Sequence, residues 1–200
     1  MKLLSQNDQV ELKEALSYMH VNELKLQLEL LQLSSKGFNK KELVERLVHY
    51  AVTGEELPPL EIPAISKAKR GAPYFLAPQE RMLYGSYKND LATRNFFKQI
   101  IGDHFHFTVQ GLDWLRERWL AGKAPTYKEF AKEWQDEYER NKQQKRAPKQ
   151  EWAYIRFVQE YIKHFPEASK AEVIDAWETR RQEQVQKVIS IFKNIKPTYS

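Results

Sequence analysis

The first clear pattern of hydrophobic positions lies in the first quarter of the chain and predicts two short helices. Residues 21–31 carry valine and leucine at three- and four-residue spacing, and this spacing returns after a polar segment, residues 34–39, that contains a single glycine. Asn22 is a suitable N-cap for the first helix. Asn39 is one for the second, and Glu42 three residues later completes a capping-box pattern. The sequence therefore predicts a helix, an extended loop and a second helix.

Helical patterns continue on both sides of this pair. A short amphipathic helix is expected over residues 8–19, and the second helix of the pair should end at Gly54. Residues 57–83 contain five prolines and little periodicity, which is typical of a partly extended linker. Beyond the linker, hydrophobic faces and capping residues predict a series of helices that begin near Asp90, Leu112, Thr126, Trp152 and Ser169.

Aromatic residues distinguish the two ends of the chain. Only Tyr18, Phe38 and Tyr50 precede the linker, whereas every tryptophan follows it. Such large side chains favour a second hydrophobic core. We therefore expect an all-α protein in three parts: a helix–loop–helix unit over residues 1–56, the linker over residues 57–83, and an aromatic-rich multi-helix domain over residues 84–200.

Composition and charge narrow the classes of function. The net charge is +5 and the pI is near 9.2, a mild bias towards polyanions. Residues 1–56 carry 7 basic and 9 acidic side chains, so that a DNA contact there should be local and should need help from a second element. The chain has no cysteine and no long apolar run. We therefore expect a cytoplasmic protein without a secretory signal or a membrane span.

The N-terminal pattern resembles the SAP motif, a helix–loop–helix DNA-binding module of chromatin, repair and bacterial proteins. Gln32 departs from that motif, because the family usually has a glycine at this position. The positions that carry the resemblance are Val21, Leu24, Lys25, Leu28, Leu33, the Ser34–Gly37 turn and the segment Lys40–Leu47.

This resemblance implies binding to double-stranded DNA. The start of a helix beside two lysines suits a phosphate, and backbone contacts with little base readout should favour the narrow groove of A/T-rich duplex. The alternative is that these lysines form a solvated face and that the unit docks on a protein. The candidate DNA-binding residues are Lys25, Lys36, Gly37, Asn39, Lys40, Lys41 and Arg46.

The C-terminal part resembles an uncharacterised helical domain that accompanies SAP motifs in bacterial proteins. The likeness covers most of residues 84–180 and implies no activity. The strings that carry it are Tyr87–Phe97, Gly102–Phe107, Thr126–Tyr127 with Trp134, Tyr154–Phe157, Pro166, Ser169 and Trp177.

A run without acidic residues gives a possible second contact with DNA. Its four cations are Lys142, Lys145, Arg146 and Lys149, and Pro148 ends any preceding helix. A contact of this run with the same duplex would raise the overall affinity, because the two sites are tethered. A solvated loop between helices is the alternative.

No motif of an enzyme is present. His104 and His106 flank Phe105 beside Asp103, but further ligands at a suitable spacing for a metal are absent, and a structural role for both is favoured. Phosphate-binding glycine loops and nucleophile motifs are also absent. We therefore expect a non-enzymatic DNA-binding protein without a cofactor. The alternative function is a protein-interaction adaptor, in which the helix–loop–helix unit and the aromatic-rich C-terminal domain both dock on a partner.

Overall fold

The structure is a computed structural model that describes residues 4, 6–143 and 152–194. Within these residues all regular elements are helices, which confirms the predicted all-α class. None of the helices in these ranges combines the length and the apolar character needed to cross a membrane. The chain divides into two compact units: residues 1–58 with 147–200, and residues 59–146.

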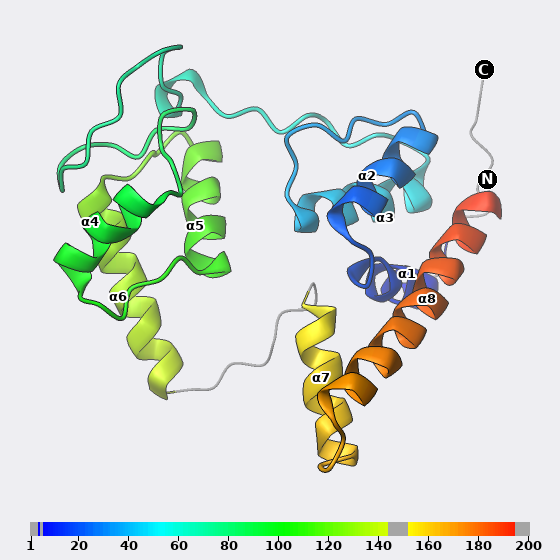
Figure 1. The fold of residues 1–200 in the computed structure, drawn as a ribbon. Coiled ribbons are helices and arrows are strands. Elements are labelled where there is room, and N and C mark those ends of the chain that lie inside the picture. The colour runs from blue at the N-terminus through cyan, green and yellow to red at the C-terminus, as the bar shows by residue number, and fades with distance from the viewer. Residues whose placement is uncertain (1–3, 5, 144–151, 195–200) are drawn as a thin grey trace. The chain divides into compact units, whose positions relative to one another are not determined.

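The first unit combines the N-terminal helices with the two last helices of the chain (Figure 1). Its helix pair α7–α8 forms a hairpin, and α8 also contacts α1. Its elements are α1 (Gln6–Ser17), α2 (Val21–Leu30), α3 (Lys40–Thr53), α7 (Ala153–His164) and α8 (Lys170–Asn194).

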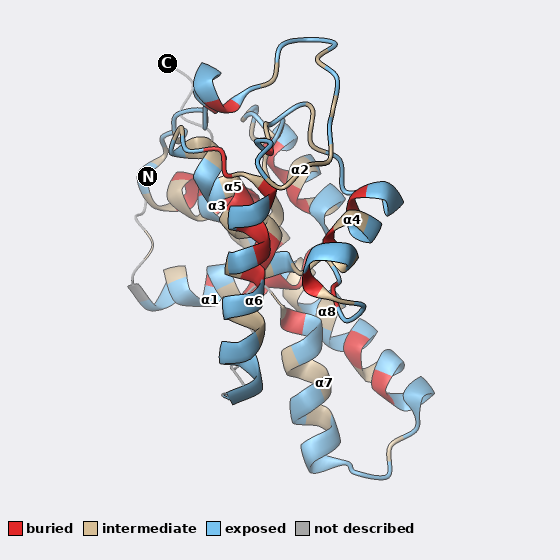
Figure 2. Ribbon diagram, turned by 90° about the vertical axis from the view of Figure 1, so that its left-hand side faces the viewer, coloured by how far each residue is buried: buried red, intermediate tan, exposed pale blue. Residues whose placement is uncertain are grey.

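Apolar residues from the first three helices, leucines above all, form most of the core of this unit, and α8 completes it. Val188 and Phe192 of α8 pack among them and are buried. A smaller cluster joins α7 and α8 to the end of α1, where the rings of Tyr18 and Trp177 stack with their centroids 5.2 Å apart. Figure 2 shows buried residues at intervals along α8, whereas most of α7 is exposed or intermediate. The apolar face of α8 therefore belongs to the same core as the N-terminal helices.

Ion pairs also connect the C-terminal helices to the N-terminal ones. Nη2 of Arg156 lies 2.9 Å from Oε1 of Glu14, and Lys187 Nζ lies 2.5 Å from Oε2 of Glu11. A further pair joins Arg181 on α8 to Glu23 on α2. Since each pair is at least partly exposed, it adds little stability, and the buried apolar contacts contribute most to docking.

The second unit has an aromatic core. Its helices α4 (Leu91–Ile101), α5 (Val109–Leu120) and α6 (Tyr127–Gln143) follow a one-turn 3₁₀ helix, η1 (Ala64–Ser66). The Asp90 side chain accepts a hydrogen bond from the Thr93 N–H at 2.9 Å, as expected of an N-cap. The buried members of the core are Met82, Phe97, Ile101, Phe105, Leu115, Tyr127, Phe130, Ala131 and Trp134.

These units differ from the parts expected from the sequence. The helices after Trp152 belong to the unit of the N-terminal core, so residues 84–200 are divided between the two units. Most of the expected linker belongs to the second unit, where Ile62 and Met82 are buried and Lys67 pairs with Tyr84 in an isolated β-bridge. A periodic apolar face shows that a helix is buried, but it does not show which helices cover it.

Candidate nucleic-acid interface

The start of α3 has the expected cap. Asn39 Oδ1 accepts a hydrogen bond from the Glu42 N–H at 2.9 Å, and Glu42 Oε2 accepts one from the Asn39 N–H at 2.8 Å. This reciprocal pair confirms the predicted capping box. It fixes the direction in which the chain enters α3, and with it the positions of Lys40 and Lys41.

The start of α2 differs from the expected one. The helix begins at Val21, and the backbone N–H of His20 donates a hydrogen bond to Glu23 Oε2 at 2.6 Å. Asn22 therefore lies inside the first turn, and the prediction that it caps α2 is wrong. The local reason is that Glu23 is three residues from His20 and can reach back to its N–H, as in the second half of a capping box.

The turn after α2 requires a left-handed residue. Gln32 has φ +58°, and among the described residues it is the one non-glycine with a positive φ. Here the Gln32 N–H donates to Glu29 O at 2.9 Å and the Leu33 N–H donates to Leu28 O at 2.9 Å, which closes the end of the helix. The resemblance to SAP motifs leads to the expectation of a glycine at this position, and a left-handed backbone is the conformation that glycine adopts at the lowest cost.

Replacing Gln32 with glycine is therefore expected to stabilise the protein by about 0.5–1 kcal/mol. A side chain in the left-handed region costs about 1–2 kcal/mol, and glycine removes this cost. Part of the gain is lost because glycine also increases the conformational entropy of the unfolded chain. Denaturant unfolding of the full chain measures the change. The matched control is Gln186→Gly, in the interior of α8, which should lose about 1 kcal/mol. A loss of stability in both variants would contradict the account of the turn.

Two of the candidate lysines are exposed beside this turn. Lys36 and Lys41 lie on either side of Gly37, which has φ +81° and open space where a side chain would project. Lys25 on α2 is half-buried. Lys36, Gly37 and Lys41 are thus exposed in the segment that leads from α2 into the capped start of α3, residues 32–41, which we call the α2–α3 turn.

Lys40 and Arg46 have contacts inside the protein. Lys40 Nζ donates to the carbonyl of Ser17 at 2.7 Å. Arg46 is 4% exposed; its Nη2 lies 2.9 Å from Glu56 Oε1, and its Nη1 donates to Pro58 O at 2.9 Å. The sequence placed both residues among the DNA contacts. The structure instead uses Lys40 to join α3 to α1 and Arg46 to hold the segment that follows α3.

Arg46 also supports the turn itself. Its guanidinium carbon lies 4.3 Å from the centre of the Phe38 ring, and its partner Glu56 accepts a hydrogen bond from the Ser34 N–H at 3.0 Å. Both ends of the loop from Ser34 to Phe38 therefore contact the same ion pair, which Arg46 forms with Glu56. A preformed loop loses less entropy when it binds a ligand.

Of the four cations in the basic run of residues 142–149, Lys142 alone lies among the residues that the structure describes. Lys142 is exposed near the end of α6, where its Nζ lies 3.2 Å from Glu139 Oε1 and 4.7 Å from the centre of the Tyr138 ring. Lys145, Arg146 and Lys149 lie outside the described residues.

The two histidines of the possible metal site contact aromatic rings. His104 packs on Trp134 and Tyr138, with ring centroids 5.6 Å and 4.9 Å apart, and Nδ1 of His106 lies 3.1 Å from the His104 carbonyl oxygen. In the part of the chain that the structure describes, no three histidines or carboxylates gather in a way that could hold a metal ion.

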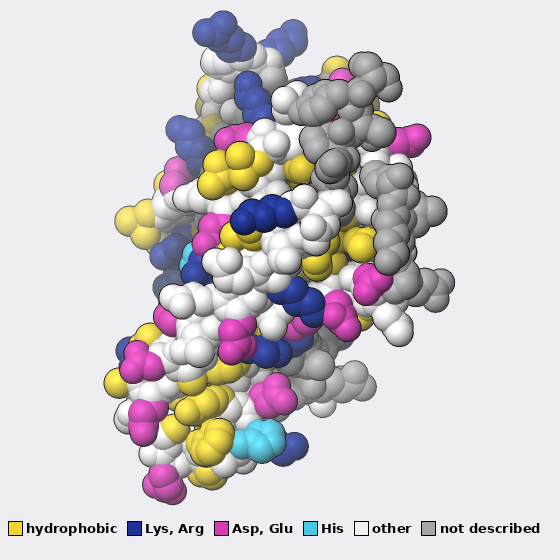
Figure 3. Space-filling view, turned by 90° about the vertical axis from the view of Figure 1, so that its right-hand side faces the viewer, with side chains coloured by type: hydrophobic (Ala, Val, Ile, Leu, Met, Phe, Trp, Pro, Cys, Tyr) yellow, Lys and Arg dark blue, Asp and Glu magenta, His cyan; other side chains and the backbone are white. Residues whose placement is uncertain are grey.

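Figure 3 shows charged side chains of both signs on one face of the protein. Lysine and arginine are more frequent towards the top of this face and acidic side chains towards the bottom, and hydrophobic side chains gather over the lower end, where the α7–α8 hairpin lies. No broad basic surface is visible on that face.

Comparison with known proteins gives a match to a family model in the second unit. Residues 79–137 match a family model described as a domain of unknown function, DUF6434. The matched segment lies in the second unit and covers α4, α5 and the first part of α6. It ends before Tyr154, so the later strings of the C-terminal resemblance lie outside it. No curated protein and no solved structure matches the chain.

Proposed function

We propose that this is a non-enzymatic, cytoplasmic DNA-binding protein of bacterial type, which contacts the backbone and minor groove of double-stranded DNA through the α2–α3 turn. The observation that carries the proposal is the exposure of Lys36 and Lys41 on either side of Gly37 at the capped start of α3. Backbone N–H groups, a helix N-terminus and two ammonium groups at one place suit a phosphate.

The internal contacts of Lys40 and Arg46 refine this proposal. Direct contacts are assigned to Lys36, Gly37 and Lys41, with Lys25 at the margin. Asn39, Lys40 and Arg46 position the turn through their contacts within the protein. Two or three charged contacts give modest affinity, and each phosphate contact contributes about 0.9 to the slope of log K against log salt.

Fluorescence anisotropy of labelled duplexes, titrated with the full chain at several salt concentrations, tests the proposal. We expect binding at low salt that weakens steeply as salt rises, with A/T-rich duplex preferred over G/C-rich duplex of equal length. Absence of binding to A/T-rich duplex at low salt, or binding that does not change with salt, would contradict it.

A second candidate function is that of a protein-interaction adaptor. The observation that favours it is an apolar groove of about 520 Å³ between α2 and α8, beside which Leu26 and Leu30 are exposed. Pull-down from lysate before and after nuclease treatment separates the two functions. The DNA-binding proposal expects retained material to be lost with nuclease, and the adaptor proposal expects it to remain.

A further inference from the structure

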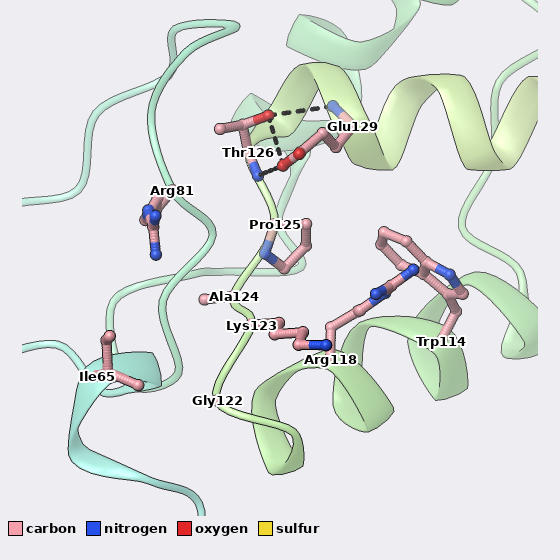
Figure 4. A pocket seen from close by; sticks show the side chains of 10 residues that line it. All are labelled: Ile65, Arg81, Trp114, Arg118, Gly122, Lys123, Ala124, Pro125, Thr126 and Glu129. Atoms are coloured by element: carbon pink, nitrogen blue, oxygen red, sulfur yellow. Dashed lines mark hydrogen bonds between the residues drawn. The ribbon is translucent and has the colours of Figure 1, made fainter.

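The second unit contains a cleft that the proposed DNA contact does not use. It has a volume of about 510 Å³, which is within the usual range for sites of small ligands. Figure 4 shows that its lining comes from separate parts of this unit: the segment before α4, helix α5, and the segment that leads into α6. The polar and aromatic side chains that matter here are Arg81, Trp114, Arg118, Lys123, Thr126 and Glu129.

The cleft carries an excess of positive charge. Three of its side chains are cations and one is a carboxylate. That carboxylate, Glu129, is already engaged, because its Oε2 accepts hydrogen bonds from the Thr126 N–H at 2.7 Å and the Thr126 hydroxyl at 3.0 Å. Hydrogen bonds from the Thr126 backbone and hydroxyl hold the pKa of Glu129 below its ordinary value, and the charges of Arg81 and Arg118 lower it further. Both guanidinium groups therefore act on the Glu129 carboxylate, from the two sides of the segment that leads into α6 (Figure 4).

Among the described residues no ion pair or hydrogen bond joins a cation of the cleft to a carboxylate, although the charges of Arg81 and Arg118 act on Glu129. No hydrogen bond or ion pair engages the side chains of Arg81 and Lys123 within those ranges, and Arg118 rests on the Trp114 ring at 5.0 Å. An arginine fork matches the oxygens of phosphate in a bidentate manner, and a stacked arginine is already oriented to do so. Described arginines that pair with carboxylates include Arg46, Arg140, Arg156, Arg180 and Arg181.

The backbone around the cleft is held in place before any ligand binds. The segment of Arg81 pairs with the segment before α6: the Met82 N–H donates to Pro125 O at 2.8 Å, and the Tyr127 N–H donates to Glu80 O at 3.0 Å. At the other end, Gly122 has φ +71°, and a side chain there would contact Ile65 at 3.4 Å. Because these walls are fixed, a ligand would have to order only the ends of the side chains.

We propose that this cleft binds the phosphate group of a nucleotide, with Arg81 and Arg118 holding the phosphate oxygens and Lys123 adding a third positive charge. A free nucleotide and a single-stranded nucleic acid offer the same phosphate chemistry. The cleft and the α2–α3 turn share no residue and lie in different units, so the cleft proposal stands whether or not the turn binds duplex DNA.

Isothermal titration calorimetry of the full chain tests this site with three probes: inorganic pyrophosphate, AMP and a single-stranded octamer of thymidine. The variant Arg81→Gln/Arg118→Gln should weaken binding at least tenfold. The matched control, Arg70→Gln/Arg94→Gln, removes two exposed arginines of the same unit that do not line the cleft and should bind within twofold of the wild type. Thermal melting followed by circular dichroism checks that each variant folds.

The result identifies the source of the phosphate as well as the site. Octamer binding at least tenfold tighter than AMP binding assigns the cleft to a strand, and equal or weaker octamer binding assigns it to a free nucleotide. If the double variant does not fold, Lys123→Gln, at an exposed turn position, should still weaken binding about threefold. No binding of any probe by the wild type, or equal weakening in the cleft variant and the control, would overturn the proposal.

Discussion

Replacing Phe192 with alanine is expected to destabilise the first unit by about 3–5 kcal/mol. Phe192 lies near the end of α8, is 5% exposed, and belongs to the same buried cluster as the leucines of α1–α3. Removal of its ring leaves a cavity in that core, so the protection of backbone amides in α1–α3 against hydrogen exchange should fall by about two to four orders of magnitude. The effect would appear at residues more than 130 positions earlier in the sequence.

The matched control is Phe165→Ala in the same unit. Phe165 is 57% exposed after α7, so this change should cost less than about 1 kcal/mol and leave the exchange of α1–α3 nearly unchanged. If Phe192→Ala also leaves those amides protected, the core of the N-terminal helices is complete without α8, and the division into units is wrong.

A second large loss of stability is expected for Phe97→Ala in the second unit. Phe97 is fully buried, and its ring centroid lies 4.9 Å from that of Phe105 and 5.0 Å from that of Phe130. Loss of one ring removes the shared neighbour of several others, so we expect a cost of about 3–5 kcal/mol. Hydrogen exchange at the amides of α4, α5 and α6 measures it.

Phe75→Ala is the control for that variant. Phe75 belongs to the same unit, is 62% exposed and lies outside the aromatic cluster. It should leave the protection of α4–α6 within about threefold of the wild type. Equal effects of the two substitutions would mean that the aromatic cluster does not form the core of this unit.

Local features of the fold were predictable from the sequence. The helix starts after Asp90 and Thr126 and the capping box of Asn39 with Glu42 depend on residues within four positions of one another, and the structure confirms them. At Ser169, the Glu172 N–H likewise donates to the serine hydroxyl, at 3.3 Å. The wrong prediction, that Asn22 caps α2, also concerns neighbouring residues. The hydrogen bond from the His20 N–H to Glu23 closes the first turn of α2, so the N-cap lies two residues before the predicted one.

Long-range packing was not predictable in this way. An amphipathic pattern in α8 does not reveal that its partner is the N-terminal core. The same limit applies to Arg46, because only the folded chain brings Glu56 and the carbonyl of Pro58 to its guanidinium. A basic residue beside a candidate binding loop therefore has two physical roles that sequence alone does not separate: contact with a ligand, or support of the loop from within.

The sequence did not predict the cleft of the second unit, because the cleft also depends on long-range packing. Arg81, Arg118 and Lys123 come from separate segments, and no local motif joins them. The Thr126–Glu129 capping pattern does predict the start of α6. It gives no information about the segment around Arg81, which pairs with the residues before that helix.

The most direct test of the DNA-binding account compares the salt dependence of the wild type with that of Lys36→Gln/Lys41→Gln on the same A/T-rich duplex. The account predicts a slope of log K against log salt that is flatter by about two units, with at least tenfold weaker binding at low salt. The control Lys13→Gln/Lys163→Gln removes two exposed lysines from α1 and α7 and should keep the wild-type slope. Equal slopes for the wild type and the turn variant, or equal losses in both variants, would contradict the assignment of DNA binding to the α2–α3 turn.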